Sequence, residues 1–168
     1  MRVVERGVAG SRNMEVLTDM PTYKALSVRQ PYAYLLVAGI KTCENRTWPT
    51  HHRGTLVIHA GAKPMTKEDW EWLDDIHKDL GQPPADRDDI LLRTSGIVGA
   101  VYLADVVARP DPDWELGWWD GASLAWMISG CQQVAEFTHL KGRLGLFDVE
   151  LPYEIEWTDD DFYPEAKR

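Results

Sequence analysis

Runs of alternating or β-branched hydrophobic residues predict four β-strands along this chain. The four runs cover residues 23–28, 54–60, 96–107 and 142–150. The dense β-branched run at 54–60 is typical of a core strand, and glycines in the last two runs mark places where a strand can bend. Two further apolar runs, 126–128 and 134–137, are too short for their spacing to distinguish strand from helix.

Two segments with helical spacing lie between these strands. The first covers residues 32–38 and ends at Gly39. The second covers residues 66–80, and Thr66 followed by Asp69 resembles a capping box at its start. Acidic residues occupy one face of this helix, and the other face carries Trp70, Leu73, Ile76, His77 and Leu80.

Five or six irregularly spaced strands with two inserted helices predict an α+β fold, in the form of a small mixed β-barrel with two or more helices packed around it. A length of 168 residues with 44% hydrophobic residues suits one domain. We expect this domain to span residues 22–151, between a flexible arm at 1–21 and an acidic tail at 152–168. Residues 1–19 show no sustained period, so an extension upstream of a start at Met20 is one interpretation.

The charge is distributed unevenly along the chain. The formal net charge is −9, but residues 21–64 contain six basic residues against the single acid Glu44, which gives +5 locally and leaves −14 elsewhere. Acidic residues gather in segments 68–89 and 150–165, where solvated faces are the simplest interpretation. We therefore expect a basic face on an acidic body, and clustered cations of this kind favour a nucleic-acid partner. The six basic residues are Lys24, Arg29, Lys41, Arg46, Arg53 and Lys63.

Several classes of protein are disfavoured by the composition. Cys43 and Cys131 form no C-x-x-C pair, which argues against a zinc ribbon or a disulfide framework and favours reduced thiols. The acidic segments lack the spacing of a calcium loop, so we predict no metal and no cofactor. No apolar run approaches membrane-spanning length, and the first twenty residues lack the apolar centre of a secretion signal, so we expect a cytoplasmic protein without a membrane partner.

The segment Gly39-Ile-Lys-Thr-Cys-Glu-Asn-Arg46 fits the signature G-x-K-x-x-E-x-R. It follows Leu26-Ser-Val-Arg-Gln-Pro-Tyr-Ala33 and precedes Val57-Ile-His-Ala60, the 97–105 strand and Gly142-x-x-Gly-Leu-Phe147. With these elements in this order, residues 23–150 resemble the ASCH domain family of the PUA-like superfamily. The resemblance implies a PUA-like barrel and a cleft that binds RNA. It also implies ribonuclease activity in some members and N4-acetylcytidine deacetylation in some compact bacterial ones.

Lys41, Glu44 and Arg46 are the central candidates for a site. A fully extended backbone would place Glu44 and Arg46 on one side and Lys41 on the other, unless a turn at 39–42 swings Lys41 back. In a functional site, Lys41 and Arg46 would hold a phosphate or a base carbonyl, while Glu44 accepts from an amino group or acts as a general base. In a structural interpretation, Glu44 and Arg46 form an ion pair that braces the barrel mouth.

Further candidates flank this motif. Arg29, Gln30 and Tyr32 lie at a strand-to-helix junction, where free backbone N–H groups favour an anion, and Arg29 is the best phosphate contact. Trp48 either stacks on a base or plugs the barrel. His59 ends a buried strand beside the expected cleft, where a hydrogen-bonded structural role competes with ligand contact. Lys63 follows in the next turn and is a further candidate for ligand contact. Four tryptophans form either a packing layer or a base-stacking loop: Trp114, Trp118, Trp119 and Trp126.

These residues support three hypotheses about function. The first is a module that binds RNA or a modified nucleoside in the basic cleft. The second is a hydrolase in which a desolvated Lys41, or Glu44, activates water, either as a ribonuclease on single-stranded RNA or as an N4-acetylcytidine amidohydrolase. In the deacetylating members, a hydroxyl residue occupies the position that matches Glu44. Of their catalytic residues, only Lys41 is therefore matched in this sequence. The third is a protein-interaction module that uses the tryptophan-rich loop and the acidic helix.

Overall fold

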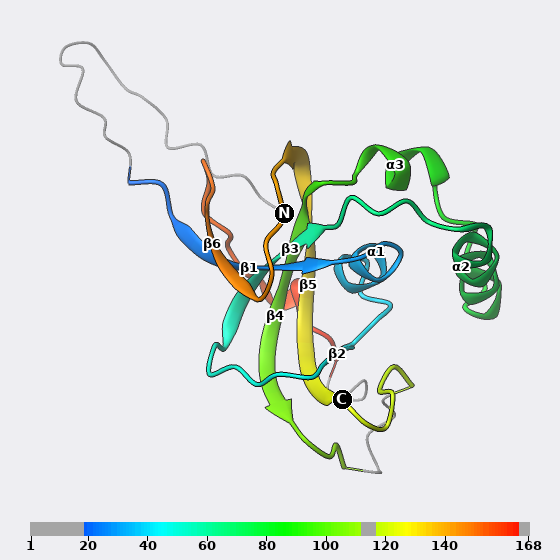
Figure 1. Ribbon diagram of the computed structural model, residues 1–168, viewed down its shortest axis with the longest axis horizontal. Coiled ribbons are helices and arrows are strands. Elements are labelled where there is room, and N and C mark those ends of the chain that lie inside the picture. The colour runs from blue at the N-terminus through cyan, green and yellow to red at the C-terminus, as the bar shows by residue number, and fades with distance from the viewer. Residues whose placement is uncertain (1–18, 112–116, 165–168) are drawn as a thin grey trace.

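The computed structural model describes residues 19–111 and 117–164, and in them helices gather on one side of a curved sheet (Figure 1). The three α-helices are α1 (Tyr32–Val37), α2 (Lys67–Asp79) and α3 (Arg87–Leu92), and a 3₁₀ turn, η1, covers Asp159–Asp161. The strands are β1 (Thr22–Val28), β2 (Cys43–Arg46), β3 (Gly54–Ala60), β4 (Gly96–Val107), β5 (Leu124–His139) and β6 (Leu146–Glu150). The chain therefore has an α+β fold, as predicted.

The six strands form one mixed sheet in the order β2-β5-β4-β3-β1-β6. Strands β1 and β3 are parallel, and every other neighbouring pair is antiparallel. Since parallel strands need a crossover connection, the chain between β1 and β3 leaves the sheet, forms α1 and returns as the edge strand β2. No pairing joins β2 to β6 within the described strands, so closure into a barrel is not confirmed.

The crossover helix α1 is held tightly against the sheet. Its buried residues Leu36 and Val37 pack with Leu26, Ile58 and other side chains of the main hydrophobic core. A Cβ placed on Gly99 of β4 would lie 2.7 Å from Cγ1 of Val37, so glycine at this position allows the helix to approach the strand closely. This packing fixes the end of α1, from which the signature segment begins.

A second apolar cluster joins α1 to the two outer helices. Leu35 of α1, Leu73 of α2 and Ile90 of α3 are buried together. Asp86 caps α3 by accepting a hydrogen bond from the Asp89 backbone N–H at 3.1 Å. These contacts place α2 beside α1, and one wall of the candidate site comes from each helix.

Most predicted elements are confirmed, and three details differ. The capping box of Thr66 and Asp69 is present at the start of α2. The two short runs at 126–128 and 134–137 belong to one 16-residue strand, β5, which long pairing with β4 holds together through several register shifts. The last strand begins at Leu146, because Gly145 adopts a left-handed turn conformation with φ of +68°. Helix α3 was not predicted, since its six residues are too few to show a helical period.

The C-terminal segment runs back over the sheet. The backbone N–H of Ile155 donates to the Tyr23 hydroxyl at 2.8 Å, and the Trp157 indole donates to Thr55 Oγ1 at 2.8 Å. Phe162 forms an isolated antiparallel bridge with Gly130. Most of the predicted N-terminal arm lies outside the described residues, and the domain limits stay predictions. No helix in the described residues is both long and apolar enough to cross a lipid bilayer.

Candidate nucleic-acid interface

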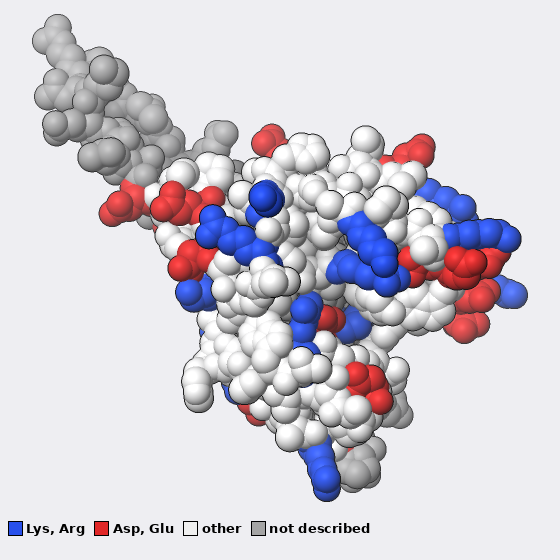
Figure 2. All heavy atoms as spheres, viewed as in Figure 1, with Lys and Arg blue, Asp and Glu red and all other residues white. Residues whose placement is uncertain are grey.

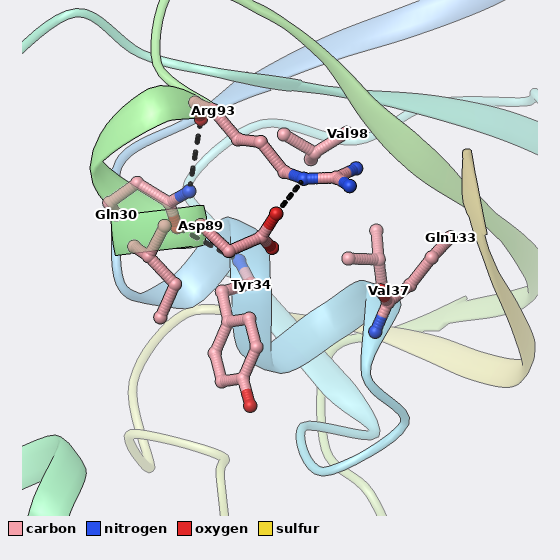
Figure 3. A pocket seen from close by; sticks show the side chains of 8 residues that line it. Gln30, Tyr34, Val37, Asp89, Arg93, Val98 and Gln133 are labelled. Carbon is pink, nitrogen blue, oxygen red and sulfur yellow. Dashed lines mark hydrogen bonds and ion pairs between the residues drawn. The ribbon is translucent and has the colours of Figure 1, made fainter. Parts of the chain in front are cut away.

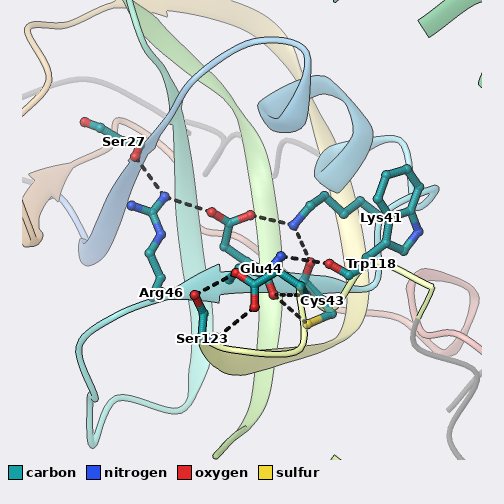
Figure 4. A network of polar contacts seen from close by, with 9 residues as sticks. Ser27, Lys41, Cys43, Glu44, Arg46, Trp118 and Ser123 are labelled. Atoms are coloured by element: carbon teal, nitrogen blue, oxygen red, sulfur yellow. Dashed lines mark hydrogen bonds and ion pairs between the residues drawn. The ribbon is translucent and has the colours of Figure 1, made fainter. Parts of the chain in front are cut away.

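The signature segment folds into a buried network of three charged side chains (Figure 4). After α1 ends, Gly39 adopts φ of +74° and the Lys41 backbone N–H donates to Leu35 O at 2.9 Å, which closes a turn. This turn brings Lys41 back toward β2, where Lys41 Nζ lies 2.6 Å from Glu44 Oε2. Arg46 Nη2 approaches the other oxygen, Glu44 Oε1, at 2.9 Å. The predicted turn is therefore present, and the three side chains converge.

Little solvent reaches this network. The side chains of Lys41, Glu44 and Arg46 are 3%, 11% and 22% exposed, respectively. Lys41 also donates to the Cys43 carbonyl, and Arg46 donates to the Ser27 carbonyl of β1 at 3.2 Å. Two cations around one carboxylate leave a net charge of +1, and buried charges of this kind are tolerated only when they are paired and hydrogen-bonded.

An aromatic hollow opens beside Lys41. It has a volume of about 630 Å³, which lies within the usual range for small-ligand sites. Tyr32 of α1 and Trp72 of α2 have ring centroids 5.4 Å apart, and Trp72 and Trp118 have centroids 6.0 Å apart. Lys41 Nζ lies 5.9 Å from the Tyr32 ring centroid, so a cation borders the aromatic surface. We call this space the aromatic hollow, and it is lined by Tyr32, Lys41, Asn45, Trp72, Ile76 and residues 117–120.

Asn45 holds the wall formed by residues 117–120. Its side-chain nitrogen donates to the Trp118 carbonyl at 2.8 Å, and its side-chain oxygen accepts from the Asp120 backbone N–H at 3.3 Å. Asp120 in turn accepts from the backbone N–H groups of Ser123 and Ala122, and these bonds hold the pKa of its carboxyl below the usual value. Asn45 therefore positions Trp118. In the signature, residue 45 is variable, whereas its neighbours Glu44 and Arg46 are fixed.

Arg29 lies at the rim of the aromatic hollow. Its guanidinium carbon is 5.9 Å from the Tyr32 ring centroid, and its side chain is 46% exposed. Arg29 Nη2 pairs with Asp69 at 2.5 Å, and the pKa of Asp69 is lowered mainly by the Thr66 backbone N–H and further by Arg29. Lys63, another of the predicted basic residues, is exposed in the loop after β3.

Comparison with known proteins identifies the family of this fold. The model of the ASCH domain matches residues 26–141, most of the chain, including the end of β1 and the whole signature segment. The chain belongs to the ASCH domain family. It is also 54% identical over 44 residues to activating signal cointegrator 1 from Homo sapiens and from Mus musculus. That match covers 26% of this chain and 8% of each relative, so the relatives are much longer proteins.

Three of the predicted site residues of this ASCH domain lie away from the aromatic hollow. Gln30 is buried, accepts from the Tyr34 backbone N–H at 3.0 Å and donates to the Arg93 carbonyl at 3.3 Å. Gln30 and Arg93 line a small cavity (Figure 3). Its volume is about 10 Å³, which has room for about one water molecule. Gln30 therefore joins α1 to the end of α3 in this structure.

Trp48 and His59 also make internal contacts. Trp48 packs edge-on against the buried Trp126, with centroids 4.8 Å apart. His59 is 2% exposed, with Nε2 at 2.6 Å from the Leu140 carbonyl and Nδ1 at 3.2 Å from Ser27 Oγ. Both side chains therefore contact the interior of the fold, and their assignment to a ligand site stays a prediction. Trp126 belongs to the core, Trp118 and Trp119 line the aromatic hollow, and Trp114 lies outside the described residues.

The basic residues of the ASCH domain are only partly gathered. Figure 2 shows Lys and Arg bordering a hollow near the middle of one face, over α1 and β2, while acidic and basic side chains mix over α2. Lys24 pairs instead with Asp148 of β6, and Arg53 pairs with Asp105 of β4. Among the predicted basic residues, Arg29 and Lys41 lie near the Tyr32 ring, and Lys41 and Arg46 share Glu44.

Cys43 lies inside the charged network but is not a nucleophile at neutral pH. Burial raises the pKa of its thiol to about 11, and the nearby Lys41 ammonium opposes this shift only in part. Since the thiolate is the reactive form, the thiol stays protonated and packs as a small apolar group. Within residues 19–111 and 117–164, no three His, Cys, Asp or Glu side chains are arranged to hold a metal ion.

Proposed function

We propose that this ASCH domain binds single-stranded RNA by taking one unstacked base, ordinary or modified, into the aromatic hollow. The observation that carries the proposal is the set of three rings, Tyr32, Trp72 and Trp118, next to the Lys41 ammonium. Proteins that recognise RNA by sequence usually bind single-stranded segments, whose splayed bases stack on aromatic side chains. The family, too, is associated with nucleic acids.

The charge distribution supports base stacking as the main source of affinity. The chain carries a formal charge of −9, and Arg29 is a half-exposed cation 5.9 Å from the Tyr32 ring centroid. The buried network adds a net charge of +1 at the hollow. We therefore expect about two phosphate neutralisations, which give a log–log salt slope of roughly −1.4 for a single strand.

The geometry favours binding over hydrolysis. Both Glu44 oxygens are engaged by cations, and Lys41 Nζ already donates to Glu44 and to the Cys43 carbonyl. A general base needs an oxygen or nitrogen free to take a proton from water, at hydrogen-bond distance from that water. Each Glu44 oxygen keeps a second lone pair, but the side chain is only 11% exposed, so water has little access to it and we place the hydrolase second.

A salt titration with matched variants tests the proposal. A short single-stranded RNA should bind more tightly than a duplex of the same length and lose about sevenfold in affinity between about 50 mM and about 200 mM salt. Arg29→Ala should make the log–log slope shallower by about 0.7, whereas Lys24→Ala should leave it unchanged. The two residues are matched, since each is about half exposed and each is paired with one acid. No binding of single-stranded RNA, or equal effects of the two variants, would contradict the proposal.

A further inference from the structure

Among the polar groups of the aromatic hollow, hydrogen-bond donors and acceptors are not equally available. We infer that the hollow selects a base that presents a carbonyl oxygen, such as uracil, guanine or hypoxanthine, over adenine. This inference rests on the proposed function and names the class of base that the same site accepts. It follows from the hydrogen-bond partners of each polar side chain that borders the hollow.

Lys41 supplies the available donor. An ammonium group has three N–H bonds and no acceptor. One of these bonds points to Glu44 Oε2 and another to the Cys43 carbonyl, and the third meets no hydrogen-bond acceptor among the residues that the structure describes. Lys41 is 2% exposed but lines the aromatic hollow, so a partner for this N–H has to approach from the hollow. A carbonyl oxygen on a bound base would satisfy it with a charge-assisted hydrogen bond.

Each side-chain carboxylate or amide oxygen next to the hollow already receives at least one hydrogen bond or ion pair, whereas Lys41 keeps an N–H without an acceptor in the described part of the chain. Glu44 receives Lys41 on one oxygen and Arg46 on the other. Asp120 accepts the Ala122 and Ser123 backbone N–H groups on Oδ1 and the Ser123 hydroxyl on Oδ2. The side-chain oxygen of Asn45 accepts from the Asp120 backbone. In a pose that directs the C6 substituent at Lys41, the amino group of adenine would oppose the ammonium with a second donor, whereas a C6 carbonyl would accept from it.

The aromatic walls do not make this distinction by themselves. Tyr32, Trp72 and Trp118 offer ring faces, and stacking on such faces tolerates every base because each has a π-face. Discrimination therefore comes from Lys41. A base with the carbonyl gains one charge-assisted hydrogen bond that a base without it lacks. The expected difference is about a tenfold or larger ratio between their dissociation constants.

Two RNA strands that differ in one carbonyl group test the inference. Each carries a single variable base in an otherwise abasic strand, either hypoxanthine, with a carbonyl at C6, or unsubstituted purine, which lacks it. We expect the wild-type protein to bind the hypoxanthine strand at least about tenfold more tightly. Lys41→Met should bring the ratio close to one, with both strands losing the contribution of the Lys41 charge equally, and Lys67→Met, on the exposed side of α2, should retain the ratio.

The possible outcomes distinguish the base selection from the proposed function. Glu44 keeps Arg46 as a partner in Lys41→Met, and the thermal midpoint of this variant reports whether it folds. If the variant does not fold, the two strands on wild-type protein still decide the question. Equal affinities for both strands would overturn the base selection and leave the proposed function intact. Failure of both strands to bind, together with ordinary single-stranded RNA, would overturn the proposed function itself.

Discussion

Replacing Glu44 with alanine is expected to lower the free energy of unfolding by about 3 to 5 kcal/mol, because it leaves two cations without their shared carboxylate. Lys41 is the more affected, since its side chain is 3% exposed and water cannot replace the lost partner. For a protein of this size, the loss corresponds to a fall in the melting temperature of about 10 °C. Thermal and urea unfolding, followed by circular dichroism, measure both quantities.

An exposed ion pair provides the control for this substitution. Glu71 pairs with Lys67 at 3.2 Å on the surface of α2, where both side chains are largely exposed. Glu71→Ala should cost only about 0.3 to 0.5 kcal/mol, as is usual for helical pairs four residues apart. Equal small losses in the two variants would show that the Glu44 network is not a buried charged unit, which would contradict our description of the site.

Removing two aromatic walls of the hollow is expected to have the largest effect on RNA affinity. Stacking of a base on an aromatic side chain contributes about 1 to 3 kcal/mol, so Trp72→Leu and Trp118→Leu should each weaken binding by roughly 5- to 150-fold. Their combination should lose more than either single change but less than the product, since both rings contact the same base. Fluorescence anisotropy of a labelled single-stranded RNA measures these changes.

Trp70→Leu is the matched control for the aromatic variants. Trp70 lies on the same helix as Trp72, but it packs under the Arg87 guanidinium and does not line the aromatic hollow. We expect this variant to bind RNA as the wild type does, at the same melting temperature as Trp72→Leu or below it. If the Trp70 substitution weakened binding as much as the other two, RNA would have to contact a different part of α2.

The sequence predicted the central motif well because its chemistry is local. Lys41, Glu44 and Arg46 lie within six residues, and a glycine with positive φ, followed by a short edge strand, is enough to bring them together. The capping box of α2 was predictable for the same reason, since its two hydrogen bonds join Thr66 and Asp69, three residues apart. In both cases the decisive interactions are between near neighbours in the chain.

The walls of the hollow depend on contacts between distant segments, which the sequence does not reveal. Trp118 meets Trp72 across 46 residues of chain and is held by Asn45, a position that the signature leaves variable. One signal was available: Trp72 lies among acids on the polar face of its helix, where a 37% exposed indole is unusual. Gln30 and His59 were assigned to the cleft by their place near the motif, whereas long-range partners fix them inside the fold.

Indole N–H signals in an ¹H–¹⁵N NMR titration test the central claim most directly. On addition of single-stranded RNA, we predict shifts of the Trp72 and Trp118 signals, since these rings line the aromatic hollow. The signals of Trp126, inside the core, and Trp157, packed against Tyr102 and Phe162, should stay in place. Shifts confined to Trp157, or none at Trp72 and Trp118 with RNA bound, would contradict base recognition in the hollow.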